Sequence, residues 1–204
     1  MDLVGRLERI LKTGAWVSHE TLGVSLREWQ LLKHDFRTKG GKRHLRVFDD
    51  AKPFLDWCRT KGWLIILVTS RPIDKYPNLF TDTVGWLTEN HLPYDFLWWS
   101  GDKAERLEEA HIVLRSQIVF AVDDSVKFIT QLTSKGIRSY LLDRYTYDVR
   151  QTDTYYQCQS LTQLMEMEES WQTTQTRNIE TTQSTKESGP ETQSLSDHNR
   201  LTLG

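Results

Sequence analysis

The segment Leu64-Ile65-Ile66-Leu67-Val68 is a continuous apolar run of strand length, without the polar alternation of a half-exposed strand. Such a run predicts a strand that is buried on both faces, as in a parallel sheet. A helical pattern precedes it: Pro53 stands in the first turn and Gly62 follows the end. The chain therefore enters a buried strand from a helix, which is the basic step of an α/β fold.

Similar segments alternate along the chain on both sides of this run. Further strands are expected at 96–99, 118–122 and 139–142, and helices at 78–90, 103–114, 126–135 and 161–169. This alternation, with short punctuated joints, predicts an α/β fold with a doubly wound parallel sheet. Ligands of such sheets bind at the carboxyl ends of the strands, so functional residues are expected there.

The composition of the chain changes after Trp171. Residues 172–204 contain no aromatic side chain and are rich in Thr, Gln and Ser. Such a segment buries too little apolar surface to offset the entropy lost on ordering, which predicts a disordered tail. Residues 1–171 are then expected to form the folded domain.

The overall charge excludes some classes of partner. The formal net charge is −2, with 26 Lys and Arg against 28 Asp and Glu, so no global field favours nucleic acid or membrane. Cys58 and Cys158 form no metal or redox motif, which suits a reducing compartment. No apolar run approaches the roughly 20 residues of a membrane span, and no signal-peptide pattern is present. We expect a soluble, intracellular (cytoplasmic) protein without a membrane partner.

Polar residues follow the first buried strand. Thr69, Ser70 and Arg71 offer a hydroxyl, backbone amides and a guanidinium, which together suit the binding of a phosphate group. The same residue types, followed by Pro72, are also ordinary turn residues after a strand. Taken alone, this segment leaves both interpretations open.

Two adjacent carboxylates follow the strand expected at 118–122. Asp123 and Asp124 are costly at the end of a buried strand unless positive charge lies nearby, and Mg²⁺ is the usual solution. Alternatively, Asp124 or Ser125 caps the next helix. One carboxylate can cap while the other binds metal, so these interpretations are compatible.

Lys103 begins the helix after the second expected strand. A lysine in this position opposes the helix dipole, although a lone lysine is usually a solvated surface residue. Its place in the order, after Thr69 and before the acidic pair, favours a role at the same sheet edge.

Together these segments resemble the haloacid-dehalogenase (HAD)-like superfamily, in its nucleotidase and polynucleotide 3′-phosphatase-like branch. The second family motif is similar to residues 68–72, the third to Lys103 and the fourth to residues 122–124; residues 83–87 with 92–95 resemble the segment after the second motif. The resemblance covers residues from about 48 to about 143, and implies a small cap insert at about 8–42.

The first family motif, Asp-x-Asp-Gly-x-Leu after the sheet's central strand, is matched only partly. The closest segment is residues 2–7, in which Asp2, Gly5 and Leu7 are in register but Val4 replaces the second Asp. Three alternatives stay open: residues 1–12 form an amphipathic helix, the chain starts further upstream, or residues 45–50 form the missing strand, which would then end at Asp49.

The resemblance implies a Mg²⁺-dependent phosphomonoester hydrolase that works through an aspartyl-phosphate intermediate. Asp2 would be the nucleophile, Thr69 a hydrogen-bond donor to phosphate, and Lys103 the group that neutralises developing charge. Asp2, Asp123 and Asp124 would hold the metal, and Ser70 and Arg71 would contact the substrate. The substrate would be a phosphorylated small molecule, a nucleotide or a polynucleotide end. The alternative is a catalytically impaired binding or scaffold module, because Val4 cannot transfer a proton.

Overall fold

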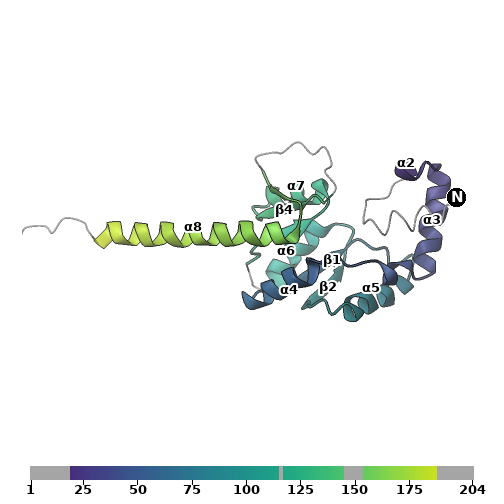
Figure 1. The fold of residues 1–204 in the computed structure, drawn as a ribbon, viewed down its shortest axis with the longest axis horizontal. Helices are drawn as coiled ribbons and strands as arrows, with labels where there is room; N and C mark the ends of the chain where they lie inside the picture. The colour runs from purple at the N-terminus through teal and green to yellow at the C-terminus, as the bar shows by residue number, and fades with distance from the viewer. Residues whose placement is uncertain (1–18, 115–116, 145–153, 188–204) are drawn as a thin grey trace, which may run out of the picture. The chain divides into compact units, whose positions relative to one another are not determined.

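The computed structural model describes residues 19–114, 117–144 and 154–187, and has a mixed α/β fold (Figure 1). The chain divides into two compact units, residues 1–165 and 166–204. The expected α/β class is confirmed, and the candidate site and the strands of the described residues belong to the first unit.

The described part of the first unit begins with short helical elements: α2 (His19–Leu22), α3 (Leu26–Thr38) and the 3₁₀ turn η1 (Gly41–His44). Ser25 starts α3 with a capping box, in which its hydroxyl accepts from the Glu28 amide and the Glu28 carboxylate accepts from the Ser25 amide. Gly40, with φ of 76°, makes the left-handed turn between α3 and η1. Residues 19–44, within and just beyond the expected cap, are therefore mainly helical.

The following elements alternate helix and strand, as the apolar pattern predicts. They are α4 (Ala51–Thr60), β1 (Ile66–Thr69), α5 (Asn78–Glu89), β2 (Phe96–Trp99), α6 (Lys103–Leu114), β3 (Ala121–Asp123), α7 (Val126–Ser134) and β4 (Ser139–Leu142). A short strand, β5 (Tyr156–Cys158), then precedes the long helix α8 (Leu161–Glu187). Each expected strand forms within three residues of its predicted bounds.

The strands form two parallel sheets. In the first, β1 pairs with β2, with Ile66 opposite Phe96; in the second, the order is β3-β4-β5. We expected the first four strands to be neighbours in one sheet. Within the described residues β1 and β3 are not paired, so the parallel direction of each pair is as expected but the single continuous sheet is not observed.

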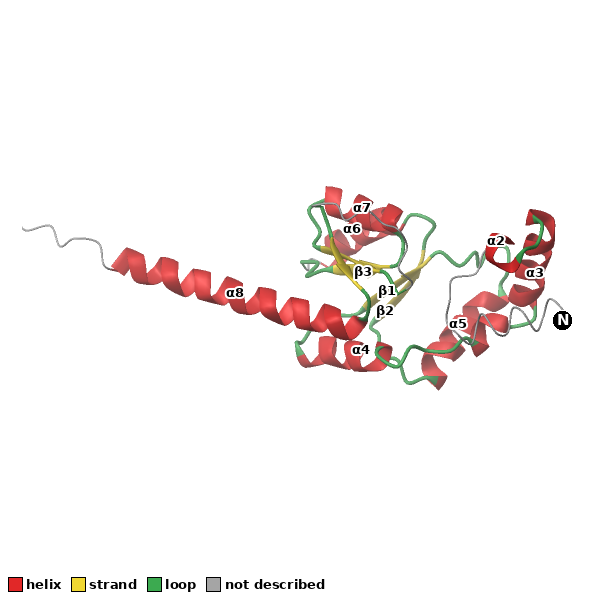
Figure 2. Ribbon diagram, turned by 45° about the horizontal axis from the view of Figure 1, so that its top comes forward, coloured by secondary structure: helices red, strands yellow, loops and turns green. Residues whose placement is uncertain are grey.

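Helices cover the strands from both sides. In Figure 2, α6 and α7 lie on one side of the strands and α4 on the other. Ile129 of α7 is fully buried against Leu141 of β4 and Tyr155, and Ala110 of α6 is almost fully buried. Phe54 of α4 meets Phe120, which precedes β3, with ring centroids 6.2 Å apart. This layering follows from the one-sided apolar faces of the helices.

Two sequence-based expectations differ from the structure. Residues 45–50 do not form a strand: residues 45–48 have no regular structure and α4 begins at Ala51. The strand fails because Asp50 stands at the N-cap of α4, where Arg144 and the Leu161 amide bind its carboxylate.

The disordered tail was expected from Gln172, but α8 continues to Glu187. A helix needs local backbone hydrogen bonds rather than a buried face, and Glu, Gln, Lys and Met are good helix formers. Thr173 and Thr174 also donate hydrogen bonds to the carbonyls of Glu169 and Ser170. Residues 188–204 lie outside the described residues.

In the part of the chain that the structure describes, no helix combines the length and the apolar character needed to cross a membrane.

Candidate functional site

The polar segment after β1 starts at the last residue of that strand. The Thr69 hydroxyl accepts a hydrogen bond from the Arg71 amide at 3.3 Å, so it already orders the turn. Ser70 is exposed. Both features fit a loop at the end of a strand that could bind phosphate. Both also fit an ordinary turn, so the two interpretations of the sequence remain.

Arg71 points toward helix α5 rather than toward the second sheet. Its guanidinium donates to the Thr83 hydroxyl at 2.6 Å and lies 6.0 Å from the centre of the Trp86 ring. Burial lowers the pKa of Arg71, and the charge of Asp82 partly opposes that effect. Arg71, which was predicted to contact the substrate, is therefore held against α5.

Lys103 and Asp123 meet, although they are 20 residues apart in sequence. The Lys103 ammonium lies 2.5 Å from an Asp123 carboxylate oxygen, and the two side chains are 17% and 12% exposed. The second Asp123 oxygen accepts from the Ser125 amide at 2.9 Å. This contact supplies the positive charge that a carboxylate at the end of β3 needs.

Asp124 is the neighbour of that pair. It keeps much of its surface in solvent, yet its pKa is raised above the ordinary value. Partial desolvation is the largest cause, the charge of Asp123 is the next, and Lys103 opposes both. Lys103 therefore does not fully compensate the negative charge of the two carboxylates.

The acidic pair can be tested as a metal site by its donor chemistry. Mg²⁺ is usually held through one or two carboxylates, with water and phosphate oxygens completing its shell. Asp123 and Asp124 supply two carboxylates with surplus negative charge, so the donor set fits. Among the residues that the structure describes, no cluster of three or more His, Cys, Asp or Glu side chains could hold a metal ion. The third predicted ligand, Asp2, lies outside the described residues.

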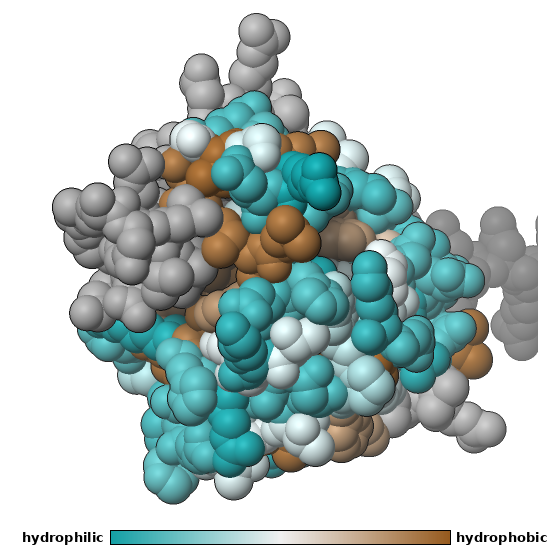
Figure 3. All heavy atoms as spheres, turned by 90° about the vertical axis from the view of Figure 1, so that its right-hand side faces the viewer, coloured by the Kyte–Doolittle hydropathy of each residue, from teal (hydrophilic) through white to brown (hydrophobic). Residues whose placement is uncertain are grey.

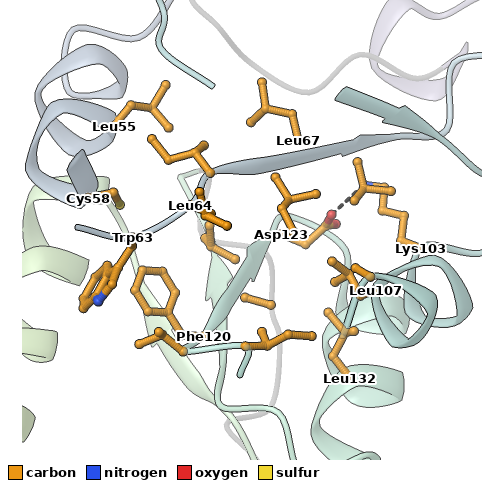
Figure 4. Close-up of a pocket in the computed structure, with 18 of the residues that line it drawn as sticks. Leu55, Cys58, Trp63, Leu64, Leu67, Lys103, Leu107, Phe120, Asp123 and Leu132 are labelled. Atoms are coloured by element: carbon orange, nitrogen blue, oxygen red, sulfur yellow. Dashed lines mark hydrogen bonds and ion pairs between the residues drawn. The ribbon is translucent and has the colours of Figure 1, made fainter. Parts of the chain in front are cut away.

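An apolar cavity of about 580 Å³ separates the two sheets next to the Lys103–Asp123 contact (Figure 4). Residues 62–68, in and before β1, and 117–123, in and before β3, line opposite sides of it; Leu55, Cys58, Leu107, Ala110 and Leu132 come from the helices. β1 pairs on one edge with β2, and β3 on one edge with β4. Within the described residues, the second edge of each strand has no strand partner.

The sequence-predicted residues are thus brought together only in part. Lys103, Asp123 and Asp124 form one group, Thr69 ends β1 with Ser70 directly after it, and Arg71 turns away to α5.

One charged group was missed from sequence: Lys33, Arg37 and Lys42, in which the charges of Lys33, Arg37 and also Arg71 act on Lys42. The four-residue spacing of Lys33 and Arg37 places them on one helix face, and was the available signal.

Comparison of the chain with models of known protein families and with curated proteins finds no match.

Proposed function

We propose that this protein is a Mg²⁺-dependent phosphomonoester hydrolase of the HAD type. The observation that carries the proposal is the Lys103–Asp123 contact at 2.5 Å, with the incompletely compensated Asp124 beside it at the end of a parallel strand. A phosphoryl-transfer site needs cationic groups around the developing charge and carboxylates that hold a cation. Both kinds of group meet here.

Each described residue has a role in this proposal. Asp123 and Asp124 hold Mg²⁺, which supplies positive charge to the phosphate oxygens. Lys103, held in place by Asp123, neutralises negative charge that develops on the transferred phosphoryl group. The Thr69 hydroxyl, at the end of β1, donates a hydrogen bond to phosphate. The substrate is a phosphorylated small molecule, a nucleotide or a polynucleotide end.

The proposed fold is one doubly wound sheet in which a strand position lies between β1 and β3. In HAD-type enzymes the strand that carries the nucleophile is at the centre of the sheet. The apolar cavity supports this position, because it separates two strands whose facing edges are unpaired within the described residues. A central strand is buried on both faces, and the cavity walls are correspondingly apolar.

The proposed nucleophile is Asp2. One of its carboxylate oxygens would bond to phosphorus while the bond to the leaving oxygen breaks, and water would then hydrolyse the aspartyl phosphate. The leaving oxygen needs a proton, and Val4 cannot donate it. Loss of general acid help typically costs about 10²–10⁴-fold in rate.

A binding or scaffold module is the second candidate function, and Val4 is the observation that favours it. Such a protein would keep the anion-binding groups without turnover.

Phosphate release from p-nitrophenyl phosphate, with Mg²⁺ or with EDTA, tests the proposal. Lys103→Met should lower the Mg²⁺-dependent rate by about 10²-fold or more, because it removes a charge that stabilises the transition state. Lys127→Met is the matched control: both ammonium groups lie near the Phe128 ring, at 4.8 and 5.9 Å from its centre, but Lys127 is exposed. Equal effects of the two substitutions would contradict the proposal, and absence of any release would favour the binding module.

A further inference from the structure

Basic side chains from separate elements gather beside α5. Lys33 and Arg37 lie on α3, Lys42 on η1, and Arg71 follows β1. The charges of the other three each act on Lys42 and lower its pKa. We call these four residues the basic cluster. Figure 3 shows the molecule from the side of α3, where polar side chains surround a small apolar patch.

Contacts between the elements fix the cluster. The Asn78 side chain of α5 donates to the Arg37 carbonyl at 2.6 Å, and the Trp86 indole donates to the Leu45 carbonyl, just after η1, at 2.7 Å. Arg43 of η1 pairs with Glu89 of α5. Both α3 and η1 are therefore attached to α5, to which the Arg71 guanidinium is also bonded.

Aromatic rings, and the charge of one carboxylate, Asp82, support the cations. Arg37 lies 5.4 Å from the centre of the Tyr76 ring, and Lys42 lies 5.7 Å from that of Phe36. Within the described residues, no cluster member forms an ion pair with a carboxylate. Asp82 acts on Arg71 through its charge, and the Asn78 side chain donates to its carboxylate.

This arrangement is costly in the free protein. Burial is the largest cause that lowers the pKa of Lys42, to about 8, and the three neighbouring cations add to it. Cation–π contacts offset only part of this cost. A bound anion would relieve both the repulsion and the desolvation, since it adds charge-assisted hydrogen bonds to the cations.

The position of the cluster relates it to the site of the proposed function. Arg71 is two residues from Thr69, the proposed phosphate donor, and its guanidinium donates to Thr83 of α5, the helix to which α3 and η1 are also attached. One ligand can therefore meet the end of β1 with one anionic group and the cluster with another.

We propose that Lys33, Arg37, Lys42 and Arg71 bind a second phosphate group of the substrate, apart from the phosphoryl group that is hydrolysed. This inference rests on the proposed function for the identity of the first phosphate. The preferred ligand then carries two phosphates, either as a nucleoside bisphosphate or as a phosphorylated end followed by the next phosphodiester of a polynucleotide.

Calorimetric titration of the full chain, with EDTA and at low salt, tests the inference without catalysis. Adenosine 3′,5′-bisphosphate should bind at least about tenfold more tightly than adenosine 5′-monophosphate, as expected for added hydrogen bonds to charged groups. Lys42→Gln should remove most of that difference, and Lys42→Arg should retain it. Lys39→Gln should leave it unchanged, because Lys39 is exposed and pairs with Asp35.

A 3′-phosphorylated dinucleotide distinguishes the two sources of the second phosphate. Tighter binding of the dinucleotide than of the bisphosphate, with the same dependence on Lys42, assigns the cluster to a polynucleotide; weaker binding assigns it to a nucleoside bisphosphate. Equal affinities for bisphosphate and monophosphate in the unmodified chain would overturn the inference. So would a Lys42→Gln effect no larger than that of Lys39→Gln. If the protein hydrolyses phosphomonoesters but binds bisphosphate no more tightly than monophosphate, only the second phosphate site is disproved. If it prefers bisphosphate but hydrolyses nothing, only the proposed hydrolase function is disproved.

Discussion

Lys103 and Lys42 are both lysines with restricted access to solvent, but their surroundings have opposite signs. The Lys103 ammonium lies 2.5 Å from the Asp123 carboxylate. Lys42 is surrounded by the charges of Arg71, Arg37 and Lys33, and burial together with these charges lowers its pKa to about 8. The charge of Lys103 is therefore compensated by a carboxylate within the fold, whereas the charge of Lys42 is not.

This difference separates two kinds of functional site. A paired lysine stays charged and oriented without any ligand, so it can act on charge that appears only during a reaction. An unpaired group of cations destabilises the free protein, and an anionic ligand that binds the folded state offsets that cost. Substitutions of Lys103, Lys42 and Asp124 test this contrast.

Removal of Lys103 should give the largest loss of stability. Lys103→Met leaves the Asp123 carboxylate without its partner in a site that is only 12% exposed, and should lower the free energy of unfolding on the order of 3 kcal/mol. Urea unfolding at pH 7 in EDTA measures the change. The double substitution Lys103→Met with Asp123→Leu should recover most of the loss, because it removes the orphaned charge. A single-variant loss no larger than that of Lys127→Met would contradict the pairing.

Removal of the Lys42 charge should raise the free energy of unfolding, whereas removal of Lys103 should lower it. The Lys42 pKa of about 8 lies below the ordinary lysine value of 10.5, so the fold disfavours the charged form. That penalty is present in full below pH 8 and fades as the pH rises from 8 to 10.5. Lys42→Gln should therefore stabilise the protein at pH 7, on the order of 1–2 kcal/mol after allowance for partial exposure.

Thermal unfolding at pH 7 and pH 10 tests whether Lys42→Gln stabilises the protein. The advantage of Lys42→Gln over the unmodified chain should shrink at pH 10, while Lys39→Gln should show no such dependence. Destabilisation by Lys42→Gln at pH 7 would contradict the like-charge description of the basic cluster.

Substitution of Asp124 should give the smallest change in the free energy of unfolding. Partial desolvation and the charge of Asp123 raise its folded-state pKa, so the ionised carboxylate is disfavoured at neutral pH and the penalty fades as the pH falls toward 4. Asp124→Asn should stabilise the metal-free protein at pH 7 by less than about 1 kcal/mol, because the residue is exposed. Equal gains at pH 4 and pH 7, measured by urea unfolding in EDTA, would show that the gain does not come from this charge.

The sequence predicted local elements better than their assembly. The bounds of β2, β4 and α6 match the prediction, because apolar runs and periodic helix faces are local signals. β5 was missed: it is three residues long and its central residue is Gln157, so no apolar run marks it. The separation into two sheets was also missed, since strand pairing depends on segments far apart in the chain.

The candidate site shows the same limit. The sequence could predict that Lys103 and Asp123 lie together, because the order of the strand ends indicates which edge of the sheet they share. The basic cluster could not be predicted, because Lys33, Arg37 and Lys42 each look like a solvated surface residue when taken alone. Only the packing of α3 and η1 against α5 lets the charges of α3 and of Arg71 act on Lys42.

Hydrolysis of two substrates with different leaving groups tests the proposed enzyme most directly. With Val4 in place of an acid, the Mg²⁺-dependent rate should be far higher for p-nitrophenyl phosphate, whose leaving group needs no proton, than for a ribose monoester. Val4→Asp should raise turnover of the ribose monoester by more than that of the aryl substrate, whereas an effect on folding alone would change both equally. If neither substrate is cleaved and Val4→Asp changes nothing, Asp2 is not the nucleophile and the protein is not the proposed hydrolase.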